Sequence, residues 1–159
     1  MPKVLVVGIG NEERGDDAAG IKLLSALTPK PDVGLLEAGT VPESYTGKMT
    51  EANAETILLL DAVDFGAAPG TVALFDHIST PRNAYTTHKA PLGLLMEYLK
   101  NESGAEVLLL GIQPKDIRTG APMSQEVQTA IDSLANLMNK HLFGAIEALR
   151  QPEAAGREA

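Results

Sequence analysis

The sequence predicts a single three-layer α/β domain, with helices on both faces of a doubly wound, mostly parallel twisted sheet of about five strands. Two observations lead to this prediction. Short, nearly unbroken apolar runs recur along the chain, as expected for strands buried on both faces of a parallel sheet. Segments with helical spacing of apolar residues lie between these runs. The 159 residues, 44% of them hydrophobic, suffice for one core, so we expect one domain over residues 1–150.

The first strand is predicted at residues 3–8 (KVLVVG), and we expect it at the centre of the sheet. Helical spacing begins near Asp17 and ends before Pro29 and Pro31. Asp16 or Asp17 is expected to cap this helix, because a carboxylate accepts hydrogen bonds from the free backbone N–H groups at a helix start. The apolar positions of the helix are Ala18, Ile21, Leu24 and Leu27.

The next strands are predicted at residues 33–36 and 56–60, and each is followed by an acid, Glu37 and Asp61 respectively. Between them, residues 42–52 are expected to be helical, with a proline in the first turn, although Gly47 weakens the pattern. The turn sequence GAAPG then leads into a strand at 71–75, which we expect at the sheet edge.

In the second half, a helix is predicted to end at Gly104, and His88 lies just before its start. Its apolar positions are Leu92, Leu95, Met96 and Leu99. The last strand is expected at 106–110, followed by a turn-rich loop from Gln113 to Met123. Ser124 should cap one long helix that contains His141 and whose apolar positions are Val127, Ile131, Leu134, Met138 and Leu142. We expect the tail, residues 151–159 (QPEAAGREA), to be disordered.

The composition narrows the class of partner. A net charge of −8 and a pI near 4.8 disfavour binding to nucleic acid or to anionic membranes, and they favour a cation or a cationic partner. The absence of cysteine excludes disulfides, thiolate metal sites and a cysteine nucleophile. The N-terminus has neither a cleavage signal nor a spanning segment, so we expect a cytoplasmic protein.

The loop after the first strand resembles a dinucleotide-binding loop, with Gly8 and Gly10 between a strand and a helix. The third glycine of that motif would fall on residue 13, which is Glu13. Four acids, Glu12, Glu13, Asp16 and Asp17, also crowd the position where a pyrophosphate would need a positive helix end. Such an enzyme would be stabilised by NAD or another nucleotide, and we expect no such effect.

Three acids, Asp17, Glu37 and Asp61, are predicted at the carboxyl ends of strands, where open α/β sheets bind ligands. An Asp at a helix start is more often a cap than a ligand, whereas Asp61, at the end of an apolar run with no adjacent base, favours a functional role by itself. His88 alone fits a loop histidine and a ligand equally well. Together, Asp17, Asp61 and His88 form an oxygen, oxygen and nitrogen set that suits a divalent ion such as nickel or zinc.

Other motifs do not support a different site. His77 is expected in a surface loop, away from the acids. The triplet Asp64-Phe65-Gly66 is expected to be a turn, since the other kinase motifs are missing. The sequence contains neither G-x-S-x-G nor H-E-x-x-H. Attack by water, assisted by a metal or by a carboxylate, is the chemistry that these residues favour.

Four motifs in register resemble the NiFe-hydrogenase maturation proteases: VVGIGNEERGDDAAG (6–20), LLLDAVDFG (58–66), TTHKAPL (86–92) and LLGIQP (109–114). The similarity spans residues 3–140 and is greatest to the branch that serves hydrogenases of the formate-hydrogenlyase type. The resemblance implies the same α/β fold and an endopeptidase that removes a C-terminal extension from the hydrogenase large-subunit precursor after nickel insertion. It also implies a monomer whose partner is that precursor.

By this resemblance, the metal-contacting and catalytic positions are Asp17, Asp61 and His88. The nickel is expected to come with the substrate, and zinc or cadmium to be able to replace it. One motif departs from the family, which has Asp-Gly-Gly where this chain has Glu37-Ala38-Gly39, and this leaves the role of Glu37 open. The alternative is a non-catalytic nickel chaperone or sensor with the same three ligands.

Overall fold

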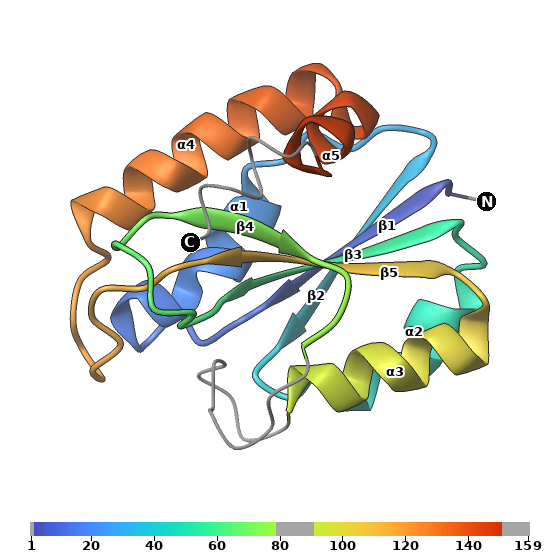
Figure 1. Ribbon diagram of the computed structural model, residues 1–159, viewed down its shortest axis with the longest axis horizontal. Coiled ribbons are helices and arrows are strands. Elements are labelled where there is room, and N and C mark those ends of the chain that lie inside the picture. Colours follow the sequence, from blue (N-terminus) through green and yellow to red (C-terminus); the bar gives the residue numbers. More distant parts are fainter. Residues whose placement is uncertain (1, 79–90, 151–159) are drawn as a thin grey trace.

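The computed structural model describes residues 2–78 and 91–150, which form an α/β arrangement around one sheet (Figure 1). The strands are β1 (Val4–Ile9), β2 (Val33–Gly39), β3 (Thr56–Ala62), β4 (Val72–Phe75) and β5 (Glu106–Ile112). Their order in the sheet is β2-β1-β3-β5-β4. Strands β2, β1, β3 and β5 run parallel to one another, and β4 runs antiparallel to β5. The predicted fold class is confirmed, and so is the edge position of β4.

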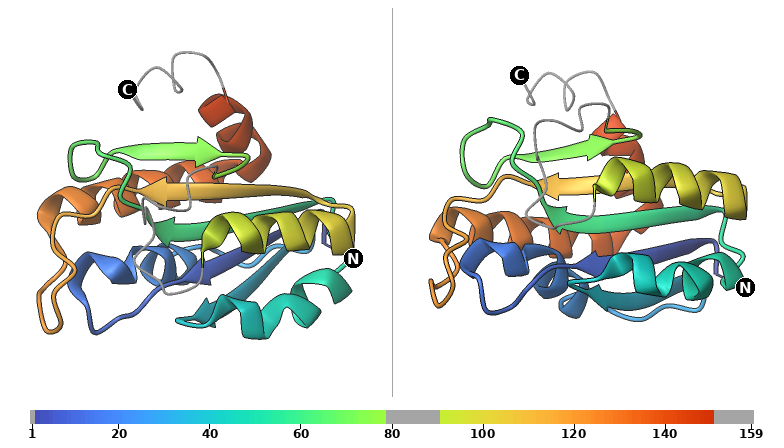
Figure 2. Two further views of the ribbon diagram at one scale, coloured as in Figure 1. Left: turned by 60° about the horizontal axis from the view of Figure 1, so that its bottom comes forward. Right: turned by 90° about the horizontal axis from the view of Figure 1, so that it is seen from below.

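The helices are α1 (Ala19–Ser25), α2 (Thr46–Glu51), α3 (Leu92–Ser103), α4 (Gln125–Lys140) and α5 (Leu142–Arg150). Two short 3-10 turns, η1 (Gly15–Ala18) and η2 (Pro42–Tyr45), lead into α1 and α2. Helices α1, α4 and α5 cover one face of the sheet, and α2 and α3 cover the other, as the turned views show (Figure 2). No helix within the described residues is long and apolar enough to cross a membrane.

Each central strand contributes to both cores, which explains its unbroken apolar sequence. In β1, Val4 and Val6 pack towards α1, whereas Leu5 and Val7 pack towards α2 and α3. Alternate residues of a strand point to opposite faces, so a strand covered on both sides needs apolar residues at every position. This burial holds the carboxyl ends of β1 and β3 at a fixed place.

Two expectations about these elements are wrong. The strand at the middle of the sheet is β3, not β1, because β5 adds beyond β3 and β4 adds beyond β5. The last helix is not continuous: His141 takes an extended conformation (φ −162°, ψ 92°) and separates α4 from α5. The break turns the buried Leu142 and Ile146 of α5 onto the same core that α4 covers.

The predicted ends of two helices are confirmed. Gly104 ends α3 in the left-handed conformation (φ 71°), which a residue with a side chain rarely adopts. The Ser124 hydroxyl caps α4 by accepting a hydrogen bond from Val127 N–H at 3.3 Å. The tail at 151–159 lies outside the described residues.

Candidate active site at the carboxyl ends of β1 and β3

Asp61 lies in the penultimate position of β3, at the carboxyl edge of the sheet, and is fully buried (0% exposed). It pairs in register with Gly111 of β5. Its Oδ1 accepts a hydrogen bond from Ala62 N–H at 2.8 Å, which fixes the carboxylate relative to the strand. A buried carboxylate at this edge is the arrangement that the sequence predicts.

Asp17 lies in η1 and is 1% exposed. Its carbonyl oxygen accepts a hydrogen bond from Asn11 N–H at 3.1 Å, so the loop after β1 folds back onto the turn. Gly10 makes this possible, because its φ is 153° and a Cβ there would lie 2.3 Å from the Asp17 carbonyl oxygen. Arg14 Nη1 lies 3.9 Å from Asp17 Oδ2 and supplies a nearby positive charge.

The elements that carry Asp17 and Asp61 are in contact at one edge of the sheet, since η1 packs against β3. The approach is close because α1 presents Gly20 to the sheet. A Cβ at Gly20 would lie 2.2 Å from the Leu60 carbonyl oxygen and 2.3 Å from that of Ile9. The backbones of α1, β1 and β3 therefore meet directly beside the two acids.

Asp16 does not cap its helix, contrary to the expectation that one acid of the pair would do so. Its buried carboxylate instead crosses to the loop after β5. It accepts hydrogen bonds from Lys115 N–H (2.8 Å), Asp116 N–H (3.2 Å), Ser124 N–H (2.7 Å) and the Ser124 hydroxyl (2.8 Å). Asp16 N–H donates to the Asp116 carbonyl oxygen at 2.8 Å. Asp16 therefore ties the turn that carries Asp17 to the 113–124 loop.

Sequence reasoning assigned no contacts to Gln113, although its side chain organises the loop after β3. Gln113 Oε1 accepts from Phe65 N–H (2.8 Å) and Ala67 N–H (3.2 Å), and its amide donates to Asp64 Oδ1 (3.0 Å). Gly66 N–H also donates to Asp64 Oδ1, at 3.1 Å, so the DFG triplet is a turn as expected. The low exposure of this polar residue (6%) is its distinguishing feature, and no sequence pattern signals it.

Glu37 and the histidines are placed differently from the two buried acids. Glu37 lies in β2 opposite Gly8, near the same edge, but its side chain is exposed. His77 lies exposed in the loop after β4, as expected, and His141 separates α4 and α5. His88 lies outside the described residues, and within residues 2–78 and 91–150 no three acidic or histidine side chains are grouped for a metal.

Ion pairs stabilise the 113–124 loop around its tie to Asp16. Arg118 Nη2 lies 2.6 Å from Asp116 Oδ2, and this hydrogen-bonded pair lowers the pKa of Asp116 from 3.8 to about 2. Lys115 Nζ lies 2.9 Å from Glu126 Oε2, which raises the pKa of Lys115 and lowers the pKa of Glu126. Both pairs are largely exposed to solvent, so they order the loop more than they stabilise the fold.

Comparisons with known proteins agree on one family. Residues 20–141 match the family model described as hydrogenase maturation protease. The hydrogenase 3 maturation protease of Escherichia coli K12 is 33% identical over 79% of this chain and 82% of its own length. The crystal structure of the NiFe hydrogenase maturation protease HycI from Thermococcus kodakarensis superposes with a TM-score of 0.78 at 33% identity, covering 87% of this chain and 90% of that one. The solution structure of the endopeptidase HycI from E. coli superposes with a TM-score of 0.74 at 28% identity, covering 88% of this chain and 90% of that one.

Proposed function

Since this chain belongs to the hydrogenase maturation protease family, and is therefore a peptidase of hydrogenase maturation, we propose that it removes the C-terminal extension of a NiFe-hydrogenase large-subunit precursor after nickel insertion. The observation that carries the proposal is the pair of buried carboxylates, Asp17 and Asp61, on contacting elements at the carboxyl edge of the sheet. The reaction adds water across one peptide bond and gives a new carboxyl end on the subunit and a free amine on the released peptide.

In this proposal the nickel belongs to the substrate, and Asp17, Asp61 and His88 complete its coordination. Two buried carboxylates near each other are unfavourable when ionised, and a divalent cation removes that repulsion. Oxygen ligands with one imidazole suit nickel, and they also suit zinc or cadmium, which we expect to bind in its place. A precursor without metal would bring no divalent charge to the two acids, so the arrangement favours the nickel-loaded form.

The substrate is recognised in the same place where the bond is cut. We propose that the ligands hold the nickel, and with it the chain that binds the nickel, so that the scissile bond lies beside the two carboxylates. The protein acts on its precursor as a cytoplasmic monomer. From the resemblance of the sequence motifs we propose a hydrogenase of the formate-hydrogenlyase type as the source of the precursor. Two relatives are named hydrogenase 3 maturation protease.

Cleavage of purified nickel-loaded and nickel-free precursor tests the proposal. The nickel-loaded form should be cut, and the nickel-free form should not be. Asp17→Asn and Asp61→Asn keep the shape of each side chain and remove its charge, and each should lower the rate about hundredfold or more. Asp132→Asn, on the exposed surface of α4, is the matched control and should cleave at the wild-type rate. Equal cleavage of both precursors would exclude recognition through nickel.

A nickel chaperone with the same ligands predicts different behaviour. Such a carrier binds free nickel tightly on its own, whereas a protease that meets nickel in its substrate needs only weak affinity for the free ion. Calorimetry on the isolated protein separates the two. Tight nickel binding without cleavage of the loaded precursor would favour the carrier.

A further inference from the structure

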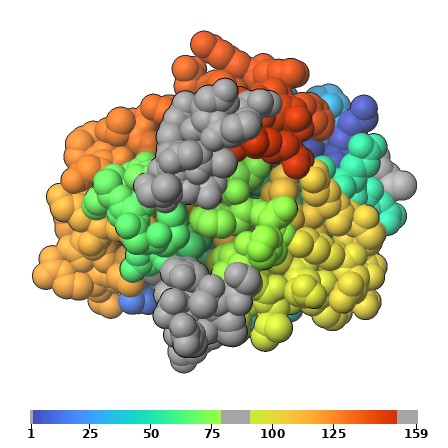
Figure 3. Space-filling view, in the orientation of Figure 1, coloured from blue at the N-terminus to red at the C-terminus, as the bar shows by residue number. Residues whose placement is uncertain are grey.

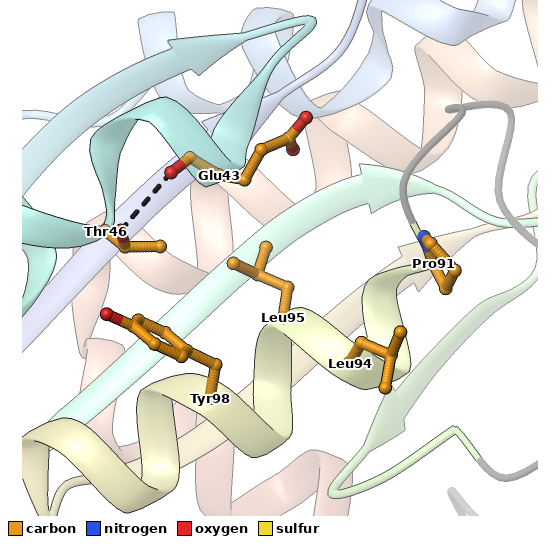
Figure 4. Close-up of a pocket in the computed structure, with 6 residues that line it drawn as sticks. All are labelled: Glu43, Thr46, Pro91, Leu94, Leu95 and Tyr98. Carbon is orange, nitrogen blue, oxygen red and sulfur yellow. Dashed lines mark hydrogen bonds between the residues drawn. The ribbon is translucent and has the colours of Figure 1, made fainter.

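An apolar groove of about 350 Å³ lies between the η2–α2 segment and α3 (Figure 4). Its lining residues are Glu43, Thr46, Pro91, Leu94, Leu95 and Tyr98. Leu94 is 69% exposed and Tyr98 is 50% exposed, which is unusual for large apolar side chains. Val41, which is 46% exposed, directly precedes η2. Leu94 and Tyr98 lie one turn apart on α3 and both line the groove, as exposed apolar side chains do at binding surfaces.

The groove begins at the edge of the sheet where the two buried acids lie. η2 directly follows the carboxyl end of β2, and α3 runs from that side back to the start of β5. The ends of the groove that carry Glu43 and Pro91 are therefore nearest to Asp17 and Asp61. In the space-filling view α3, coloured yellow, forms part of the outer surface (Figure 3). The exposure of Leu94 and Tyr98 leaves the groove open to a partner.

The dimensions of the groove suit a short extended peptide. Pro91 and Tyr98 are seven positions apart along the chain, which corresponds to a length of about 10 Å along a helix. An extended chain covers that length with about three residues. The volume lies at the lower end of the range for sites that enclose a ligand, and it fits a few side chains rather than a folded surface.

The charge of the groove indicates what kind of peptide fits. Glu43 is its one charged lining residue, and within the described residues no basic side chain forms an ion pair with it. Figure 4 shows Glu43 on the η2 side of the groove, opposite α3, with its carboxylate pointing away from Leu95. A net charge of −8 over the whole chain adds to the attraction for a cation at this position.

We propose that this groove binds the precursor segment next to the scissile bond, through an apolar side chain that packs on Leu94 and Tyr98 and a lysine or arginine that pairs with Glu43. The inference rests on the proposed function, because it takes the precursor as the peptide that reaches this edge. It adds a second point of recognition, independent of nickel. The groove selects the sequence beside the cut, while the acids select the metal.

The test measures binding and cleavage of the nickel-loaded precursor by wild type and by Leu94→Asp. Leu94 is mostly exposed, so the substitution should leave the thermal unfolding of the free protein unchanged. We expect the Kd and KM for the precursor to rise about tenfold or more, with kcat within twofold of wild type. Leu137→Asp on α4 is the matched control, since Leu137 is also an exposed helical leucine (43%), on the opposite layer. It should behave as wild type.

Substitutions of Glu43 test the charge. Glu43→Gln should raise KM a few-fold and reduce its dependence on salt, and Glu43→Lys should raise KM further. An unchanged Kd in Leu94→Asp would overturn the proposal. A wild-type dimer in sedimentation that Leu94→Asp dissociates would also overturn it, because the groove would then bind a second copy of the chain.

The two proposals fail in different ways. If wild type cleaves only nickel-loaded precursor but Leu94→Asp binds it normally, the groove assignment is wrong and the proposed function stands. If wild type cleaves both forms equally, recognition of nickel is wrong, and the Kd ratio between wild type and Leu94→Asp still decides the groove.

Discussion

At the scale of single residues, two adjacent acids have different tasks. Asp17 belongs to the candidate site. The carboxylate of Asp16 instead accepts hydrogen bonds from backbone N–H groups and a hydroxyl group at residues 115, 116 and 124. The two differ because successive residues of the η1 turn point in different directions. Asp16 therefore positions Asp17 by fixing the turn on which both lie.

Replacing Asp16 should weaken the fold and the activity together. Asp16→Ala removes the acceptor of four hydrogen bonds and leaves their part-buried donors without that acceptor, so we expect the free energy of unfolding to fall by about 3 kcal/mol. Urea unfolding measures the loss, and Asp132→Ala on α4 serves as the control. A loss below 1 kcal/mol, or about the value of a single neutral hydrogen bond, would contradict this role.

Asp116 gives a prediction about pH. Its pKa is lowered from 3.8 to about 2 by the hydrogen-bonded Arg118, so the ionised form is favoured in the folded state. The resulting stabilisation is present above pH 4 and is lost as the pH falls through 2. Thermal unfolding of wild type and Asp116→Asn should therefore differ at neutral pH and converge near pH 2. A difference that persists at pH 2 would assign the effect to another interaction.

The sequence is sufficient to place Asp17 and Asp61 at one edge of the sheet, because Asp61 ends an apolar run that forms β3 and Asp17 lies between β1 and the first helix. It is not sufficient to separate the tasks of Asp16 and Asp17, since the partners of Asp16 lie about a hundred positions away. The same holds for Gln113, whose partners lie in the loop after β3. The role of His88 stays a prediction.

At the scale of elements, local sequence patterns predict which segments form strands and helices, but not the order of the strands in the sheet. Apolar runs predict β1, β3 and β5, and Gly104 predicts the end of α3. The position of β3 at the centre depends on where β5 and β4 pair, which a local pattern does not contain. Local spacing does not indicate the break at His141, because apolar positions at helical intervals continue through Leu142.

The contact of α1 with the sheet gives a prediction at this scale. Gly20→Ala places a Cβ against two backbone carbonyls, which cannot rotate away, so α1 must shift and carry η1 with it. We expect a loss of about 3 kcal/mol in the free energy of unfolding and a fall in cleavage rate. Gly47→Ala in α2 is the matched control, because the nearest atom to its new Cβ lies at 4.0 Å. It should stabilise by about 0.5 to 1 kcal/mol. Equal effects of the two substitutions would contradict the close packing.

At the scale of the whole molecule, the two cores meet at β3. Its residues from Ile57 to Ala62 are fully buried, and parallel strands pair with it on both sides. Amide hydrogens there should exchange only through global unfolding, and those of the edge strands β2 and β4 should exchange faster through local opening. Hydrogen exchange followed by mass spectrometry or NMR measures the order. Protection of β4 equal to that of β3 would show that the sheet opens as one unit.

The bonds of Asp16 also have a consequence for how the protein is made. The groups that Asp16 binds, in Lys115, Asp116 and Ser124, are synthesised about a hundred residues after it. A growing chain can form β1, α1 and the local hydrogen bonds of η1 early, but the hydrogen bonds of Asp16 cannot form until the 113–124 loop has left the ribosome. The turn that carries Asp17 is therefore held at both of its ends only after the 113–124 loop has been synthesised.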